Sequence, residues 1–234
     1  MSHHYISFEN LSFSYPKGPE VLHDINLRIT HGERVALLGL NGSGKSTLLL
    51  QTNGLLFPSS GRVVVGDVPV TRKTAPEVRR RVGMVFQNPD DMLFMPTVAD
   101  DVAFGPRNMK LPEQEVARRV NNALEAVGIP SLASSPSFML SGGQRRAAAI
   151  ATVLSMEPDI LVLDEPSANL DMRACNSLVK TLSEFNHTIL LATHDLELAR
   201  NLTPRAILLH EGRVLADTSL DEAIGILSQL ADSH

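Results

Sequence analysis

The chain has 234 residues, of which 43% are hydrophobic and 20% charged, and its formal net charge is −5. This mildly acidic balance argues against a nucleic-acid-binding protein, which usually presents a basic face. The longest apolar stretch, 147–156, is interrupted by Thr152 and Ser155 and is too short to span a membrane. The single cysteine, Cys175, excludes an internal disulfide and fits a reducing compartment. We therefore expect a soluble protein of the cell interior with no nucleic-acid partner.

The N-terminal part predicts antiparallel strands. Apolar and polar residues alternate from Ile6 to Tyr15 and again from Val21 to Ile29, and residues 62–67 form a further strand that ends in a turn. A period of two is typical of strands with one buried face. The chain is therefore expected to open with an antiparallel β layer.

A phosphate-binding loop follows the short apolar strand predicted at 34–38. Residues 39–47 read G-x-x-x-x-G-K-[ST]-T, and a helix is expected from Ser46 to Asn53. A strand, a glycine loop and a helix in this order aim several main-chain N–H groups and a helix dipole at one point, which attracts a triphosphate. Lys45 can reach the β- and γ-phosphates, and the Ser46 hydroxyl can ligate Mg²⁺. The predicted ATP-binding residues of the loop are Gly39, Asn41, Gly42, Ser43, Gly44, Lys45, Ser46 and Thr47.

Two acidic residues come directly after the buried strand predicted at 160–163. Because the carboxyl ends of parallel strands line the ligand crevice, Asp164 is expected beside the phosphate loop, where it can hold Mg²⁺ directly or through water. Glu165 can orient or deprotonate a water molecule near the γ-phosphate. Two acids at a strand end can also form a solvated or helix-capping pair, but the upstream phosphate loop favours the catalytic interpretation.

Gln87 and His194 also follow predicted strands, at 82–86 and 189–192. Each residue type is usually structural when it stands alone. Here both are expected at the same sheet edge, with His194 near the γ-phosphate and Gln87 near the metal or the attacking water. Such groups supply the positioning and charge stabilisation on which phosphoryl transfer depends.

The alternation of strands and helices predicts an α/β fold: a P-loop NTPase (RecA-like) core with a mostly parallel sheet covered on both faces. Residues 1–87 and 157–230 are expected to form the antiparallel layer and this core. Residues 88–156 are expected to form an inserted helical subdomain, with one helix over 112–127 and another over 145–154. The whole chain, 1–234, is then one nucleotide-binding domain.

The segment Ser141-Gly142-Gly143-Gln144 opens the second of these helices. The pattern S-x-x-Q is a capping box, which is a purely structural feature. Two glycines at a helix start also expose N–H groups to an outside anion. This second phosphate site has no place on the sheet of the first nucleotide, which suggests that it serves a neighbouring subunit.

Taken together, these motifs resemble the ATP-binding subunits of ABC transporters over nearly the whole chain. The phosphate loop is similar to Walker A, residues 160–165 to Walker B, and 140–144 to the LSGGQ signature; 167–171 resemble the D-loop, Gln87 the Q-loop and His194 the switch histidine. Tyr15 matches the aromatic residue that stacks on adenine. The resemblance implies a head-to-tail dimer, with two ATP molecules between Walker A of one subunit and Ser141, Gly143 and Gln144 of the other.

Residues 88–98 and 101–106 resemble the energy-coupling-factor (ECF) importers, and most closely their cobalt and nickel ATPases of the CbiO type. Those proteins usually carry Gln where this chain has Met92. The implied role is ATP-driven metal uptake at the cytoplasmic face of the membrane, with an integral coupling subunit and a substrate-binding membrane subunit. The alternative substrate is a vitamin such as biotin, and the alternative dimer pairs this chain with a paralogue. Two other functions are a soluble ABC ATPase and a regulatory module without turnover. The apolar cluster 92–95 is either subdomain core or a groove for a partner helix.

Overall fold

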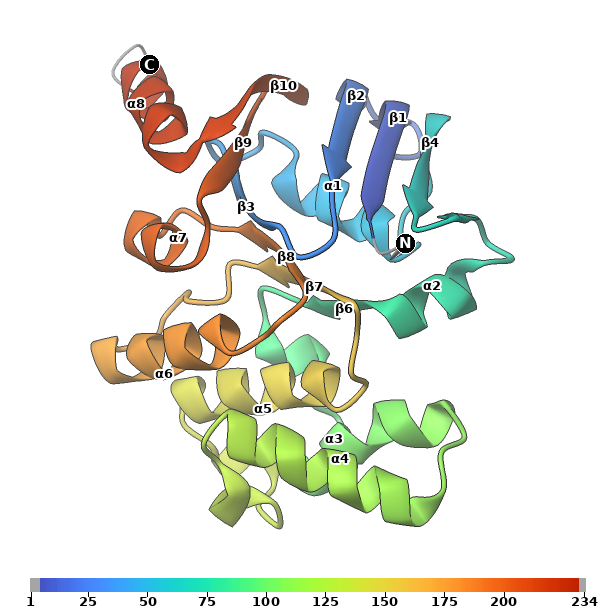
Figure 1. Ribbon diagram of the computed structural model, residues 1–234, viewed down its shortest axis with the longest axis vertical. Helices are drawn as coiled ribbons and strands as arrows, with labels where there is room; N and C mark the ends of the chain where they lie inside the picture. Colours follow the sequence, from blue (N-terminus) through green and yellow to red (C-terminus); the bar gives the residue numbers. More distant parts are fainter. Residues whose placement is uncertain (1–4, 232–234) are drawn as a thin grey trace.

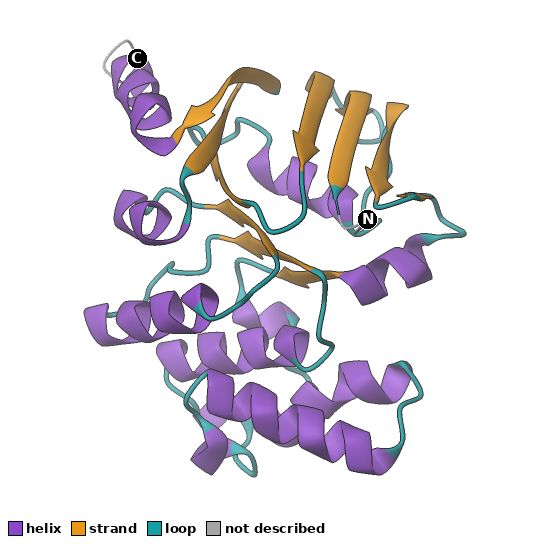
Figure 2. Cartoon of the chain, in the orientation of Figure 1, coloured by secondary structure: helices purple, strands orange, loops and turns teal. Residues whose placement is uncertain are grey.

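The computed structural model describes residues 5–231, and its strands form two sheets (Figures 1 and 2). The first sheet is antiparallel, in the order β2-β1-β4-β5. Its strands are β1 (Ile6–Ser14), β2 (Glu20–Ile29), β4 (Ser60–Val65) and β5 (Val68–Pro69). Ile6, Phe8, Leu11 and Phe13 are buried, which confirms the predicted antiparallel layer.

The second sheet has the order β10-β9-β3-β8-β7-β6, and only β10 runs antiparallel to its neighbour. Its strands are β3 (Arg34–Leu38), β6 (Val82–Val85), β7 (Ile160–Asp164), β8 (Thr188–Ala192), β9 (Arg205–His210) and β10 (Arg213–Ser219). Every residue of β6, β7 and β8 is buried, as expected for a parallel sheet covered on both faces. The predicted α/β class is therefore confirmed.

Helices cover the second sheet and extend from one end of it (Figure 2). They are α1 (Lys45–Thr52), α2 (Ala75–Arg81), α3 (Val98–Asn108), α4 (Glu113–Ala126), α5 (Gly142–Leu154), α6 (Met172–Ser183), α7 (Leu196–Leu202) and α8 (Leu220–Ala231), with short 3-10 helices η1 (Pro89–Asp91), η2 (Pro130–Leu132) and η3 (Ser137–Met139). In the described part of the chain, no helix is both long enough and apolar enough to cross a membrane.

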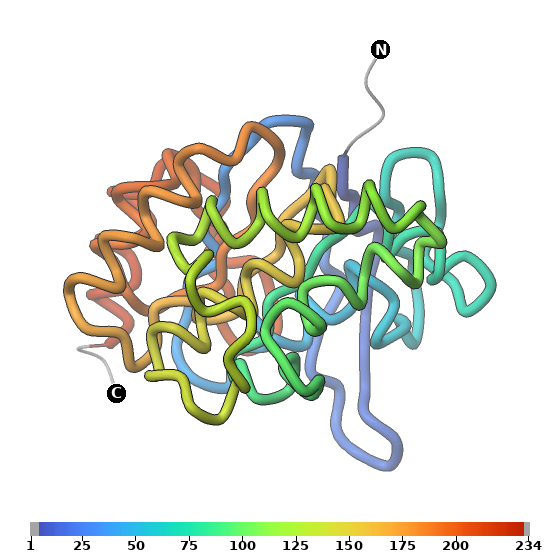
Figure 3. Tube along the Cα trace, turned by 90° about the horizontal axis from the view of Figure 1, so that it is seen from below, coloured from blue at the N-terminus to red at the C-terminus, as the bar shows by residue number. Residues whose placement is uncertain are grey.

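The helical segment lies at one end of the molecule, where α3 and α4 run side by side in front of the sheet (green in Figure 3). Val102 of α3, Leu124 of α4 and Ile150 of α5 belong to one hydrophobic cluster, which also includes Leu161 and Leu163 of β7. The helices therefore share a core with the sheet. The subdomain boundaries at 88 and 156 stay a prediction.

Two helices differ from the sequence prediction. α3 was not predicted, because Gly105 and Pro106 lie inside it and normally break a helix. α8 was also not predicted; its Leu220 and Ala223 share a hydrophobic cluster with residues of β3 and β9, so the helix packs on one face of the second sheet. α6 begins at Met172, because the Asp171 side chain accepts from the N–H of Ala174 and caps the helix.

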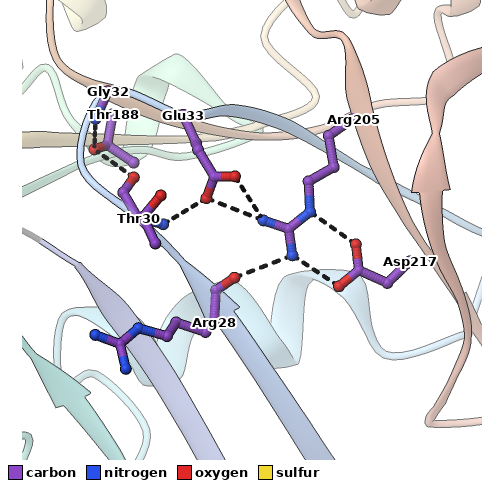
Figure 4. A network of polar contacts seen from close by, with 7 residues as sticks. All are labelled: Arg28, Thr30, Gly32, Glu33, Thr188, Arg205 and Asp217. Carbon is purple, nitrogen blue, oxygen red and sulfur yellow. Dashed lines mark hydrogen bonds and ion pairs between the residues drawn. The ribbon is translucent and has the colours of Figure 1, made fainter.

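A polar network around Arg205 joins the two sheets (Figure 4). Its guanidinium contacts Glu33 at 3.0 Å and Asp217 at 2.7 Å, and it donates to the main-chain oxygen of Arg28 in β2. The Glu33 carboxylate also accepts from the N–H of Thr30, at the end of the same strand. The hydrogen bonds from Arg205 to Asp217 raise the pKa of the guanidinium, which is therefore held in its charged form.

Candidate functional site

The phosphate loop connects β3 to α1 and depends on two of its glycines. Gly39 has φ 150°, and a Cβ there would lie 2.3 Å from the main-chain oxygen of Leu209. Gly44 has φ 103°, and a Cβ there would lie 2.8 Å from a methyl group of Leu22. A side chain at either position would displace the loop from the strands behind it. The conformation of this loop therefore requires glycine at both positions.

A cavity of about 290 Å³ lies in front of this loop. Gln87, Asp164 and Glu165 line it together with the loop, because they lie at the carboxyl ends of β6 and β7, which are on the same side of β3 in the sheet. The full lining is Val21, Asn41, Gly42, Ser43, Gly44, Lys45, Ser46, Thr47, Gln87, Asp164 and Glu165. The structure therefore brings together most of the residues predicted to bind ATP and metal.

Lys45 lies at the base of the cavity. Its Nζ donates to the main-chain oxygens of Gly39, at 2.8 Å, and Leu40, at 3.1 Å. Burial lowers the pKa of the ammonium, and the nearby carboxylates of Glu165 and Asp164 oppose this shift. A partly desolvated ammonium attracts a phosphate oxygen more strongly than an exposed one, because water screens the charge less.

Asp164, the last residue of β7, has the properties of a metal ligand. The residue is only 6% exposed, and within residues 5–231 its Oδ1 is buried without a hydrogen-bond partner. Burial raises the pKa of the carboxyl, while a hydrogen bond with the Ser46 side chain opposes the shift. Mg²⁺ is typically bound by one or two protein oxygens together with substrate phosphates. Asp164, Ser46 and the side-chain oxygen of Gln87 are oxygen donors at the same cavity, so the residues present fit this ion.

Glu165 and His194 form a pair across neighbouring strands. The Oε2 atom of Glu165 lies 2.8 Å from Nδ1 of His194 and accepts from the main-chain N–H of the same histidine at 3.2 Å. Glu165 has φ 47° and donates its own N–H to Ala192 of β8. A positive φ is uncommon for a residue other than glycine. Its carboxylate is buried at the cavity, whereas the His194 side chain is 74% exposed and joins the site through Glu165.

Tyr15 stands beside the cavity at the end of the first hairpin. Its hydroxyl lies 3.2 Å from Oγ1 of Thr47, and its ring packs edge-on against Phe13. The residue is 42% exposed. The predicted aromatic residue is thus tied directly to the phosphate-loop helix.

The residues predicted to form a second phosphate site lie elsewhere. Ser141 and Gln144 form both hydrogen bonds of the capping box, so the structural interpretation is confirmed. With Gly143 they line a different cavity, of about 480 Å³, between α5 and α6, where Asn169 and Asp171 also contribute. In the part of the chain that the structure describes, Ser141, Gly143 and Gln144 are outside the lining of the phosphate-loop cavity.

Sequence reasoning missed two residues at this site. Val21 lines the cavity from the start of β2, which only the folding of the first sheet over the loop could place there. Arg146, in the first half of α5, is buried and donates to the main-chain oxygens of Phe86 and Gln87. In the sequence, Arg146 looks like a solvent-exposed residue just after a capping box. Its burial depends on residues that are distant along the chain, so no local pattern indicates it.

Comparison with known proteins places this architecture in a family. The family model described as ABC transporter matches residues 22–168. The chain belongs to the ABC transporter family. An ABC transporter ATP-binding protein of Geobacter sulfurreducens is 56% identical over 225 residues, which cover 96% of this chain and 90% of that protein. The energy-coupling factor transporter ATP-binding protein EcfA of Methanocaldococcus jannaschii is 44% identical, covering 91% and 78%.

Among solved structures, this ABC protein superposes on CbiO1 of Clostridium perfringens, part of the ABC transporter complex CbiONQ, with a TM-score of 0.84. The two are 41% identical, and the match covers 97% of this chain and 93% of CbiO1. The fold is therefore that of an ABC cassette, as the resemblance implied. ATP-binding subunits of this family hydrolyse ATP, so the protein is an ATPase.

Proposed function

We propose that this ATPase is the motor subunit of an ECF-type importer that couples closing and opening of a dimer to the uptake of cobalt or nickel. The similarity to EcfA and to CbiO1 supports the importer type. The resemblance of residues 88–98 to cobalt and nickel ATPases supports the metal. Vitamin uptake is the alternative that the experiment below tests.

One observation supports the proposed dimer of ATP-binding subunits. Ser141, Gly143 and Gln144 line a cavity other than that of Lys45 and Asp164, so a signature motif that contacts ATP has to meet the nucleotide of another subunit. Gly142 and Gly143 begin α5 and offer N–H groups to an anion. ATP joins the two subunits because its γ-phosphate fills both half-sites, and hydrolysis removes this shared anion.

Each residue of the cavity has a proposed role in this cycle. Gly39, Asn41, Gly42, Ser43, Gly44 and Thr47 position the phosphates, Lys45 neutralises them, and Tyr15 stacks on adenine. Asp164, Ser46 and Gln87 hold Mg²⁺, which when bound neutralises charge that develops on the phosphates. Glu165 accepts the proton of the attacking water, and His194 orients that carboxylate from the neighbouring strand.

The partners follow from the importer type. The second cassette is another copy of this chain or a paralogue, and the pair works with an integral coupling subunit and a substrate-binding membrane subunit. The ATPase then lies at the cytoplasmic face of the membrane. This placement is compatible with an acidic chain in which the described residues hold no membrane-spanning helix.

The test is purification of the tagged chain with its membrane subunits, followed by reconstitution into lipid vesicles that trap ATP on the cassette side. We expect ATP-dependent uptake of radioactive cobalt or nickel, which Glu165→Gln abolishes. ATP-dependent uptake of biotin without metal uptake would identify the vitamin alternative. Recovery of ribosomes or DNA in place of membrane proteins would overturn the importer proposal.

A further inference from the structure

Arg146 is a buried charged residue that connects α5 to the Q-loop. It lies two residues after Gln144 and is only 3% exposed. Its Nη1 donates to the main-chain oxygen of Phe86 at 2.9 Å, and its Nη2 donates to that of Gln87 at 2.6 Å. Burial lowers the pKa of the guanidinium, and the charge of Asp164 opposes the shift. The guanidinium is therefore tied directly to the Q-loop.

The backbone around Gln87 is held by side chains from the helical segment. The N–H of Phe86 donates to the sulfur of Met92 at 3.4 Å, and Arg146 holds the next two carbonyls. Gln87 itself lines the phosphate-loop cavity. Met92, where CbiO-type ATPases usually carry Gln, thus has a structural contact at the start of this loop. The position of the Gln87 side chain consequently depends on residues that lie outside the sheet.

α5 links two sites. Ser141 caps its N-terminus, at the cavity between α5 and α6, and Arg146, within its first two turns, reaches the Q-loop. Five residues span little more than one helical turn, and a hydrogen-bonded helix moves as a unit over this distance. A shift of the signature motif would therefore displace the two carbonyls that Arg146 holds.

We propose that Arg146 is a positioning residue for ATP hydrolysis. It fixes Gln87 at the nucleotide cavity and makes its position follow the signature end of α5. This inference rests on the role proposed above for Gln87. The hydrogen bonds from Arg146 to two carbonyls can also serve stability alone. The experiment therefore has to separate a role in stability from a role in hydrolysis.

The experiment compares Arg146→Met and Arg146→Lys with Arg34→Met as a matched control. Arg34 also donates to main-chain oxygens, those of Leu182, Ser183 and Phe185. These residues lie at the C-terminal end of α6 and just after it, away from the Q-loop. For each variant, kcat, the affinity for ATP without Mg²⁺, and the melting temperature are measured. We expect Arg146→Met to lower kcat about 10- to 100-fold, the size of effect that a small misplacement causes. The affinity for ATP without Mg²⁺ should change less than about 2-fold, because the substitution removes no direct contact with the nucleotide.

Arg146→Lys keeps the charge and can keep one of the two bonds, so it should recover part of kcat. If Arg146→Met does not fold, the kcat of Arg146→Lys tests the inference instead. Arg34→Met should lower the melting temperature while kcat of the folded protein stays within about 2-fold of wild type.

A Gln87→Ala background tests whether Arg146 acts through Gln87. If it does, Arg146→Met or Arg146→Lys should lower kcat less than about 2-fold further in that background, because residues that act as one unit are not additive. Independent, multiplicative losses would overturn the inference while leaving the role of Gln87 intact. Wild-type turnover of Gln87→Ala alone would overturn the proposed role of Gln87, and the inference with it. Unchanged kcat in both Arg146 variants would overturn the inference alone.

Discussion

The Oε2 atom of Glu165 lies 2.8 Å from Nδ1 of His194 and accepts a hydrogen bond from the main-chain N–H of that residue at 3.2 Å. Glu165 follows β7 and His194 follows β8, two strands that pair in parallel. The register of the sheet therefore decides the orientation of the proposed catalytic base. A histidine that holds a carboxylate in this way resembles the orienting member of a catalytic pair.

Glu165→Gln should bind MgATP and accumulate as a dimer but release phosphate about 10²–10⁴-fold more slowly, because an amide cannot accept the proton. Phosphate release and size-exclusion chromatography with MgATP measure the two effects. His194→Ala should lose less turnover, since the main-chain bond to Glu165 remains. A Glu165→Gln protein with wild-type turnover would show that another group is the base.

Tyr15→Ala should weaken ATP binding about 5- to 150-fold, since stacking of a base on an aromatic ring contributes about 1–3 kcal/mol. Tyr15→Phe keeps the ring and loses only the hydroxyl contact with Thr47, so its affinity should stay within about 3-fold of wild type. Titration with a fluorescent ATP analogue compares the two. Equal losses in both variants would assign the effect to the hydroxyl and would exclude stacking.

Asp101 should make stability depend on pH. This buried residue of α3 accepts from the N–H groups of Phe94 and Met95 through Oδ1, and among residues 5–231 its Oδ2 has no partner. Burial raises the pKa of the carboxyl, the two N–H groups lower it, and the charge of Asp100 raises it. A raised pKa in the folded state means that the folded protein binds the proton more tightly than the unfolded chain does.

The stabilisation from the protonated Asp101 is therefore complete below the pKa that an aspartate has in the unfolded chain, about 3.9. It is lost as the pH rises through the higher pKa of the folded state. Asp101→Asn keeps an acceptor oxygen and does not titrate. We expect the unfolding free energy of wild type, minus that of Asp101→Asn, to fall as the pH rises from about 4 to 8. Urea denaturation at each pH measures it, and a constant or rising difference would contradict the prediction.

Arg205→Met should lower the unfolding free energy by about 1–3 kcal/mol, because Glu33 and Asp217 lose their shared cation at the junction of the sheets. Arg62→Met is the control: its guanidinium pairs with Glu9 at 2.6 Å, but its side chain is 68% exposed, and such exposed pairs contribute little to stability. Chemical denaturation compares the two. Equal losses would show that the junction contributes no more than a surface pair.

Local sequence patterns determined much of this protein. The phosphate loop between β3 and α1, the acids at the end of β7, the capping box at Ser141 and the antiparallel hairpin depend largely on local patterns, and each has the predicted local structure. α3 and α8 were not predicted, although Leu220, Ala223 and Ile224 of α8 recur at helical spacing. Pro106 within α3 even opposes a helix locally.

Only the tertiary structure decided which polar groups share an environment. Glu165 meets His194, and Arg146 reaches Gln87, because strand order and helix packing join segments that are 29 and 59 residues apart. Burial of Arg146 and Asp101 is likewise invisible in the sequence, where both look like surface charges. Proximity in the chain fixes local conformation, whereas desolvation and charge pairing depend on distances that arise only when the whole chain is folded.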